Sequence, residues 1–172
     1  MKGSAAKGNK LEKEVATLLS KVVYGREFVL RRVPLLMAGG WTKQVSGDVV
    51  VDPTALLRGE SNWDVYCECK NYADFGITDI FKDVSTGKQP LLETFWITAI
   101  RSAGDRKPLL VFRAARWVTP LAAVRNDGFP VLPVARCMKL WNGEDIALFR
   151  MSDLSKNGNA AAFRRWARPD VH

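Results

Sequence analysis

Apolar side chains recur at helical spacing near the start of the chain. Intervals of 4, 3, 1 and 3 residues separate five of them, and such intervals place the side chains on one stripe of an α-helix. The members of the stripe are Leu11, Val15, Leu18, Leu19 and Val22. The pattern predicts a first helix that ends before Gly25, preceded by a frayed segment over residues 1–10.

Short stretches rich in apolar and β-branched residues predict a set of strands between turn-forming residues. These stretches cover residues 28–33, 47–52, 63–70 and 109–112. The second and third strands are expected to pair as a hairpin with a long connection around Pro53. The run 109–112 is apolar throughout, which is typical of a central strand covered on both faces.

The order of helices and strands predicts an α/β fold with a mixed central sheet flanked by helices. Turn signals and periodicity supply the elements that complete this order, and Pro90 is well placed at the start of one helix. These elements are a glycine-containing loop over 35–46, helices over 77–87 and 91–103, edge strands over 131–134 and 147–150, and a short basic helix over 157–168.

Length and composition set the class of protein. A chain of 172 residues, of which 47% are hydrophobic, has the size of one compact domain, so we expect a single domain over residues 1–172. No run of about 18 apolar residues occurs, and the start of the chain lacks the apolar core of a signal peptide. We therefore expect a soluble cytoplasmic protein that binds no membrane.

Charge is distributed unevenly along the chain. Residues 1–47 carry a net charge of +6, residues 48–94 carry −5 and residues 95–172 carry +7. Basic flanks of this kind are typical of a surface that binds nucleic-acid phosphates. Carboxylates beside such a surface repel the ligand unless a divalent cation lies between them, as in metal-dependent nucleases. The alternative is an acidic, solvated face.

Charged side chains can converge on the expected hairpin. Asp48 begins one strand, and the next strand ends with Cys67-Glu68-Cys69-Lys70. Because side chains alternate between faces along a strand, Glu68 and Lys70 point the same way while both cysteines point the other way. If the strands pair, the two carboxylates can share a divalent cation such as Mg²⁺, which prefers oxygen ligands.

This group of residues can hydrolyse a phosphodiester. The backbone carbonyl of Cys69 is a candidate further metal ligand, and Lys70 can orient or deprotonate the attacking water. A surface strand with alternating charges is the alternative, although charges at the ends of buried strands are costly unless they are paired or bound to metal. Cys67 and Cys69 could instead be half of a zinc site with Cys137 and His172, but core packing explains them better.

The same residues resemble a known family of enzymes. Asp48 with Glu68-Cys69-Lys70 looks like the signature of the PD-(D/E)xK nuclease superfamily, with Gly47 where many members carry Pro. The stretch Lys7–Glu14 is similar to the pattern that opens archaeal and phage-type Holliday junction resolvases. The resemblance covers about residues 7–116, so that residues 117–172 would form a C-terminal extension.

The resemblance implies a restriction-endonuclease-like core and a structure-selective DNA endonuclease. It implies cleavage of four-way (Holliday) junctions by a homodimer that uses Mg²⁺, with Mn²⁺ as a substitute, in a bacterial or phage-infected cell. Glu12 of the first helix would join the metal ligands Asp48, Glu68 and the Cys69 carbonyl, and Lys70 would be catalytic. Glu14 is the alternative on the same helix.

Basic residues near the expected site would hold the DNA backbone, with ordinary solubilising charge as the alternative for any one of them. Two other functions remain open: a nuclease of restriction, repair or exonuclease type, and a non-catalytic DNA-binding module. The presence of Asp48, Glu68 and Lys70 together argues against the silent module. The candidate DNA-binding residues are Lys7, Lys10, Lys13, Arg31, Arg32 and Lys43.

Overall fold

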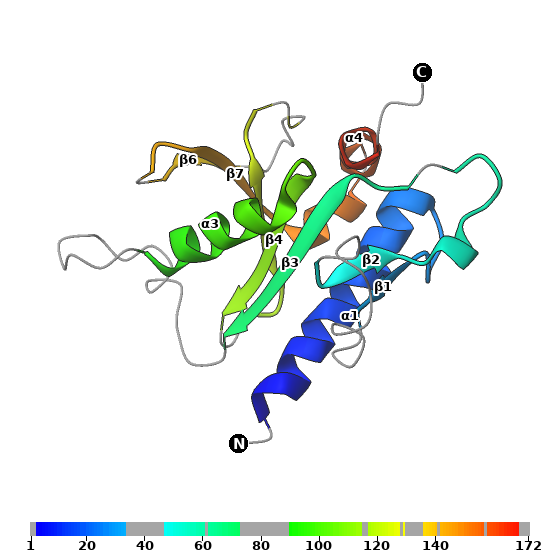
Figure 1. Ribbon diagram of the computed structural model, residues 1–172, viewed down its shortest axis with the longest axis horizontal. Coiled ribbons are helices and arrows are strands. Elements are labelled where there is room, and N and C mark those ends of the chain that lie inside the picture. Colours follow the sequence, from blue (N-terminus) through cyan, green and yellow to red (C-terminus); the bar gives the residue numbers. More distant parts are fainter. Residues whose placement is uncertain are drawn as a thin grey trace.

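A mixed β-sheet forms the centre of the molecule, with helices on both of its faces (Figure 1). The structure is a computed structural model that describes residues 3–33, 47–60, 62–72, 90–114, 117–127, 129, 136–140, 142–156 and 158–168. Its helices are α1 (Gly3–Tyr24), α3 (Leu91–Ala103) and α4 (Asn159–Ala167), with short 3-10 helices at η2 (Pro53–Ala55) and η4 (Met151–Ser155). Its strands are β1 (Leu30–Arg32), β2 (Val49–Val51), β3 (Val65–Tyr72), β4 (Lys107–Ala114), β5 (Leu121–Arg125), β6 (Arg136–Lys139) and β7 (Asp145–Arg150).

The described strands form one seven-stranded sheet in the order β1-β2-β3-β4-β5-β7-β6. Strands β3 and β4 run parallel, and every other neighbouring pair is antiparallel. A parallel pair needs a crossover connection, and α3 lies in the segment that joins β3 to β4. The mixed sheet expected from the sequence is confirmed.

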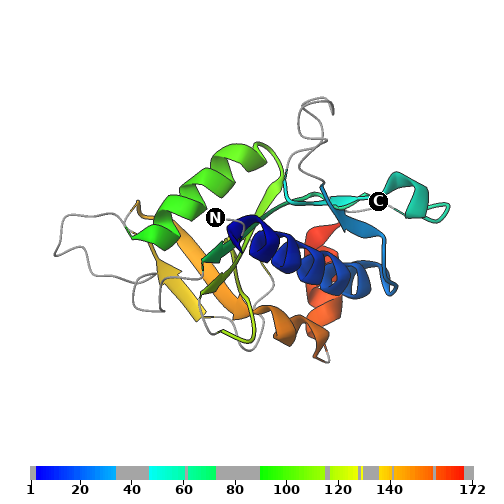
Figure 2. The ribbon, with the colours of Figure 1, turned by 90° about the horizontal axis from the view of Figure 1, so that it is seen from below.

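Two hydrophobic cores lie on opposite faces of the sheet, and β4 contributes to both. Leu109 and Val111 pack into the core under α1 and α4, whereas Leu110 and Phe112 pack into the core under α3. All four side chains are at most 2% exposed, so the run 109–112 is a central strand covered on both faces, as expected. Figure 2 shows α1 and α3 on either side of the strands.

The first helix ends where the sequence predicts but begins earlier. Its apolar stripe is buried, with Leu11 and Leu19 0% exposed, and the helix ends at Tyr24 before Gly25, which has φ of +73°. The expectation of a frayed segment over residues 1–10 is wrong for Gly3–Lys10, which is helical. Alanine and lysine are strong helix formers, so this segment needs no apolar stripe to continue the helix.

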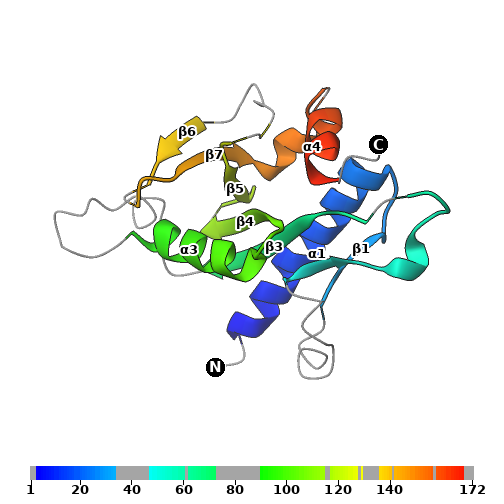
Figure 3. The ribbon, with the colours of Figure 1, turned by 45° about the horizontal axis from the view of Figure 1, so that its top comes forward.

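The last third of the chain extends the sheet and completes the first core. Helix α4 packs beside the C-terminal half of α1, where Arg164 donates hydrogen bonds to the carbonyl of Val22 (Figure 3). Phe129 stacks on Phe149 with ring centroids 5.5 Å apart. Both rings belong to the same buried cluster as Leu11, so residues beyond 116 share a core with the N-terminal helix.

Several expected boundaries are corrected by the structure. The strand expected over 28–33 begins only at Leu30, because Phe28 has φ of +65°, which breaks extended geometry. The segment 147–150 is not an edge strand, since β7 lies between β5 and β6, and β6 forms the edge. Three expected elements lie outside the described residues: the loop over 35–46, the helix over 77–87 and the strand over 131–134.

Strand β5 had no counterpart in the sequence-based expectation. Its middle residues, Ala122 and Ala123, are poor strand formers that give no alternating pattern. They are fully buried between β4 and β7, where small side chains let the two sheet faces be covered closely. In the described part of the chain, no helix has the length and apolar character needed to cross a membrane.

Candidate active site

The Asp48 carboxylate is held at the edge of β3 by the backbone. Strand β2 pairs with β3 through Val49 opposite Cys67, and the pairing continues one residue further, where the Asp48 N–H donates to the Cys67 carbonyl over 2.8 Å. The next donor along β3, the Cys69 N–H, points to the Asp48 side chain and donates to Oδ2 over 2.7 Å. The hairpin expected from the sequence therefore exists, and its end is closed by a carboxylate.

Gly47 makes this close approach possible. Its φ is +114°, a region that side-chain-bearing residues rarely adopt. A Cβ atom at this position would lie 3.1 Å from the Cys67 carbonyl oxygen and 3.5 Å from Cδ2 of Tyr66. Proline, with φ fixed near −65°, does not fit this backbone, which explains why the chain departs here from the pattern that it resembles.

Glu68 and Lys70 lie on the same face of β3, as strand alternation predicts. The Lys70 Nζ is 2.5 Å from Glu68 Oε1, and the hydroxyl of Tyr66 donates to Glu68 Oε2 over 2.7 Å. Cys67 is fully buried in the core on the opposite face. Both oxygens of Glu68 are thus fixed by neighbours two residues away on the same strand.

An aromatic side chain from α3 lies beside Lys70. Its Nζ lies 5.9 Å from the ring centroid of Phe95, within the range of a cation–π contact. The ring of Phe95 is also 4.9 Å from that of Tyr72. Neither Tyr66 nor Phe95 was among the residues singled out from the sequence, although strand alternation alone places Tyr66 on the Glu68 face.

The site carries more negative charge than its surroundings neutralise. Burial raises the pKa of Asp48 to about 6, against the hydrogen bond from Cys69, and the charges of Glu68 and Glu12 raise it further. For Lys70, burial alone would lower the pKa, but the hydrogen bond and charge of Glu68 outweigh it, so the pKa of Lys70 is raised. The surroundings therefore favour the charged form of Lys70 and disfavour the charged form of Asp48.

Glu12 approaches the site from the other side of the sheet. It lies on α1, where its carboxylate forms an ion pair with Nε of Arg32 in β1. Its charge reaches both Asp48 and Cys69. Glu14, the alternative on the same helix, pairs with Arg113 over 2.8 Å instead, so Glu12 is the helix acid whose charge acts on Asp48.

The oxygen donors fit a hard divalent cation. The N–H and C=O of a strand residue point to the same side, so the Cys69 carbonyl shares an edge with the Asp48 carboxylate that its N–H binds. Asp48, Glu68 and this carbonyl are oxygen ligands of the kind that Mg²⁺ prefers, and a cation between the carboxylates would offset the burial and the repulsion that raise the pKa of Asp48. Across the residues that the structure describes, however, no three His, Cys, Asp or Glu side chains are grouped closely enough to hold a metal ion by themselves.

A zinc site built on the cysteines is inconsistent with the sheet. Cys67 lies on β3 and Cys137 on β6, and three strands separate them. With neighbouring strands about 4.8 Å apart, this separation is roughly 19 Å. A side-chain hydrogen bond to Cys67, together with burial, raises the pKa of the Cys69 thiol well above its usual value.

The basic residues expected to bind DNA are placed in different settings. Lys13 is exposed on α1, Lys10 lies 4.0 Å from Glu14, and Arg31 pairs with Asp52 over 3.0 Å. Arg32 is mostly buried against Glu12. Lys7 is in the part of α1 whose side chains are not described, and Lys43 lies outside the described residues.

Comparison with known proteins gives one match. The family model described as phage putative PDDEXK endonuclease matches residues 3–133. This range is well over half of the chain and contains Glu12, Asp48, Glu68 and Lys70. No curated protein and no solved structure matches.

Proposed function

The chain belongs to the phage putative PDDEXK endonuclease family, and from this premise we propose that it is a Mg²⁺-dependent endonuclease that cuts branched DNA, above all four-way (Holliday) junctions. The observation that supports a working nuclease is the contact of 2.7 Å between the Cys69 N–H and Asp48. It brings the motif residues of two separate strands together at one sheet edge, beside Glu68 and Lys70.

In the proposed reaction, Asp48, Glu68 and the Cys69 carbonyl hold Mg²⁺, or Mn²⁺ in its place. A cation held by these residues would supply Lewis-acid chemistry, by polarising the scissile phosphate and by making water a better nucleophile. Asp48 is already positioned by the Cys69 N–H, so it needs little reorganisation to act as a ligand. Glu68 is positioned by Tyr66 and Lys70.

Lys70 acts as a cation in this scheme. Its raised pKa keeps the amine protonated at neutral pH, so the ammonium orients the attacking water and stabilises the charge that develops on the phosphate. Removal of a proton from water by Lys70 would require a neutral amine. The expectation that Lys70 deprotonates water is therefore the less favoured of the two roles.

Glu12 contributes negative charge from the α1 side of the sheet. Its carboxylate forms an ion pair with Arg32, so direct ligation of the metal requires Glu12 to leave that partner. The proposed role is to strengthen the field that draws the cation to Asp48, with Arg32 setting the position of Glu12. Binding of the DNA backbone by Lys10, Lys13 and Arg31 belongs to the same proposal.

The junction substrate and the homodimer are proposed together. A four-way junction has two-fold symmetry, so paired nicks ask for two active sites related by a two-fold axis. A restriction, repair or exonuclease activity at the same site is the second candidate, because the family description specifies endonuclease chemistry without a substrate. The proposed setting is the cytoplasm of a bacterial or phage-infected cell.

The decisive experiment is cleavage of labelled four-way, flap, single-stranded and duplex DNA, with Mg²⁺, Mn²⁺ or Ca²⁺. We expect Mg²⁺-dependent nicking that is fastest on the four-way junction. Asp48→Asn and Glu68→Gln should abolish cleavage while binding of DNA persists, because each removes a charge that the metal needs and that otherwise repels phosphate. Glu14→Gln is the matched control, since Glu14 pairs with Arg113 away from the strand carboxylates.

Each result has a separate consequence. Equal cleavage of junction and duplex would replace the junction preference with the restriction or repair alternative. Binding of DNA without Mg²⁺-dependent cleavage would support the third hypothesis, a non-catalytic DNA-binding module. Junction binding can also be tested by salt titration in Ca²⁺. The slope of log K against log salt should be about −0.9 for each phosphate neutralised on duplex arms, and it should be steeper for the junction than for duplex DNA.

A further inference from the structure

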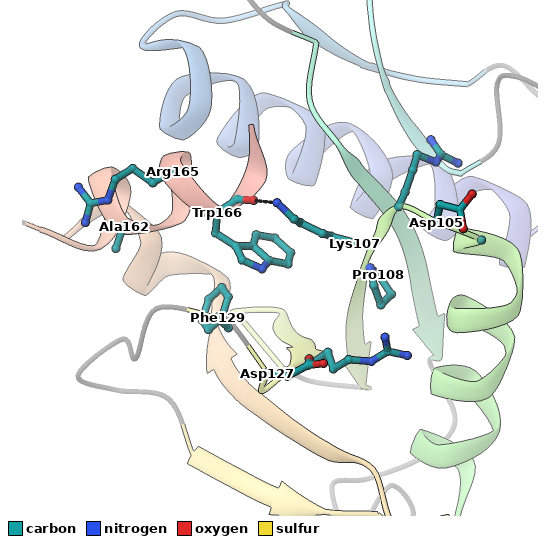
Figure 4. Close-up of a pocket in the computed structure, with 11 residues that line it drawn as sticks. Asp105, Lys107, Pro108, Asp127, Phe129, Ala162, Arg165 and Trp166 are labelled. Carbon is teal, nitrogen blue, oxygen red and sulfur yellow. Dashed lines mark hydrogen bonds between the residues drawn. The ribbon is translucent and has the colours of Figure 1, made fainter. Parts of the chain in front are cut away.

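A cavity of about 800 Å³ opens at the end of the sheet where β4 begins. Three regions that are far apart in the sequence line it (Figure 4): the turn from α3 into β4, the end of β5 with the residues after it, and α4. We call it the α4–β4 pocket. Its basic and aromatic lining residues are Arg106, Lys107, Arg125, Phe129, Arg165 and Trp166.

Two aromatic rings of the first core form the floor of the α4–β4 pocket, where Phe129 is 5% exposed and Trp166 is 8% exposed. The rings of Phe129 and Trp166 meet edge to face, with centroids 5.2 Å apart and planes at 84°. The Nζ of Lys107 donates to the Trp166 carbonyl over 2.8 Å, as Figure 4 shows. This hydrogen bond ties the last turn of α4 to the start of β4 and so fixes where Trp166 lies in the pocket.

The rim of the pocket is cationic. Four lining side chains are basic and two, Asp105 and Asp127, are acidic, so the lining carries a net positive charge. Arg165 is exposed on α4, and Arg125 is 42% exposed with only a long contact of 3.5 Å to Glu144. Weak pairing of this kind leaves an arginine able to exchange a carboxylate for a phosphate.

Size selects among anionic ligands. A volume of about 800 Å³ falls within the roughly 300–1,000 Å³ typical of sites for small molecules. A duplex presents paired bases and two backbones, which a pocket of this size does not enclose. One unpaired nucleotide combines the two features that the pocket matches, a phosphate for the rim and a flat apolar base for the floor.

The pocket lies close to the proposed nuclease site. In the parallel register, Lys107 stands opposite Val65 and Leu110 opposite Glu68, so three residues of strand, about 10 Å at ~3.3 Å each, separate the two levels. On the Glu68 face, the Arg106 guanidinium lies 5.3 Å from the ring centroid of Tyr66, and Tyr66 binds Glu68. One DNA strand can therefore reach both sites.

We propose that the α4–β4 pocket binds an unpaired nucleotide of a DNA strand, with Arg125 and Arg165 on its phosphate and its base against the small exposed parts of Phe129 and Trp166. This inference rests on the proposed function for its choice of DNA as ligand. It gives the enzyme a means of recognising single-stranded segments next to a branch point, which a purely duplex-binding surface lacks.

The test compares single-stranded and duplex oligonucleotides of equal length in Ca²⁺, by salt titration of binding to the full chain. The double variant Arg125→Gln with Arg165→Gln should lower the single-strand slope of log K against log salt by about 0.7, since the two arginines together neutralise one phosphate of the strand. The duplex slope should change less. Lys21→Gln with Arg58→Gln removes the same charge outside the pocket lining and should affect both substrates alike.

Two results would overturn the inference: unchanged single-strand binding in the pocket variant, or equal weakening of single-strand and duplex binding. Thermal unfolding of both double variants checks that the fold is retained, which exposed charges favour. The nuclease proposal fails separately, through absence of Mg²⁺-dependent cleavage by the wild-type chain. Selective loss of single-strand binding in the pocket variant supports the pocket even in that case.

Discussion

The backbone N–H of Cys69 donates a 2.7 Å hydrogen bond to Oδ2 of Asp48, and this contact decides where the carboxylate lies. The backbone of Asp48 is held as well, because its N–H binds the Cys67 carbonyl and its own carbonyl accepts from Val33. A buried carboxylate with other acids nearby is costly without a cation. Burial of the Asp48 charge, together with repulsion from Glu68 and Glu12, therefore costs free energy that a bound cation would offset.

Asp48→Asn is expected to stabilise the metal-free protein at neutral pH. Burial raises the pKa of Asp48 from 3.8 to about 6, so the folded state binds this proton more tightly than the unfolded state. The associated stability is fully present below about pH 4 and is lost as pH rises through about 6. Asparagine stays neutral and its carbonyl oxygen can still accept from Cys69.

Thermal unfolding in the presence of a chelator, from pH 4 to pH 7, checks this expectation. The melting temperature of the variant should rise relative to wild type across that range. Asp52→Asn is the control of opposite sign, because hydrogen bonds from Thr54 lower the pKa of Asp52 and its removal should cost stability as pH rises. A difference in melting temperature between Asp48→Asn and wild type that does not vary with pH would contradict the raised pKa of Asp48.

Lys70→Ala should retain metal binding and lose rate. The ammonium pairs with Glu68 at 2.5 Å and lies over Phe95, so its loss leaves the carboxylate ligands in place and more negative. Loss of a group that acts on water and on the developing charge typically costs ~10²- to 10⁴-fold. Calorimetric titration of metal and single-turnover cleavage measure the two effects. If metal affinity collapsed while the rate per bound metal stayed normal, Lys70 would have a structural role.

The hairpin that carries the site could be predicted because its signal is local. Alternation along β3 separates Glu68 and Lys70 from Cys67 without any tertiary information, and the apolar run 109–112 identifies the central strand beside it. The same rule places Tyr66 on the Glu68 face, so the sequence already indicates that the Tyr66 hydroxyl can contact Glu68.

The parts that could not be predicted depend on long-range packing. The ion pair between Glu12 and Arg32 joins α1 to β1 across a turn, and nothing in the spacing of the two residues specifies it. The α4–β4 pocket brings Lys107, Arg125 and Trp166 together from three elements. Strand β5 has no alternating pattern, because Ala122 and Ala123 are both small and both buried. Their burial follows from the position of β5 between β4 and β7, which the local sequence does not indicate.

Tyr66→Phe should weaken metal binding and slow cleavage without affecting DNA binding. The variant removes the hydroxyl that donates to Glu68 Oε2 over 2.7 Å and leaves the ring between Gly47 and Arg106. Residues that orient a metal ligand typically change metal affinity or activity by about 10- to 100-fold. A Mg²⁺ titration of single-turnover cleavage, with binding measured in Ca²⁺, separates the two effects.

Tyr72→Phe is the matched control for this variant. Tyr72 lies on the same face of β3, and its ring contacts Phe95, so the substitution removes a hydroxyl while the ring contact remains. It should change the Mg²⁺ dependence much less than Tyr66→Phe does. Equal effects of the two substitutions would show that the hydroxyl of Tyr66 has no specific part in holding Glu68.

Gly47→Ala should destabilise the fold and also reduce cleavage, because the residue next to it carries the Asp48 carboxylate. Gly47 has φ of +114°, and an added Cβ would lie 3.1 Å from the Cys67 carbonyl oxygen. Backbone strain of this kind costs about 1–3 kcal/mol, and relief of the contact would move Asp48 away from the Cys69 N–H.

Gly59→Ala separates the effect of positive φ from the effect of the close contact. Gly59 also has positive φ, +85°, but nothing lies within 4 Å of its Cβ position. Denaturant unfolding should show a loss of stability in both variants that is larger for Gly47→Ala, and single-turnover cleavage should fall in Gly47→Ala alone. Full activity in Gly47→Ala, with a stability equal to that of Gly59→Ala, would mean that β2 and β3 can move apart at this point without disturbing the site.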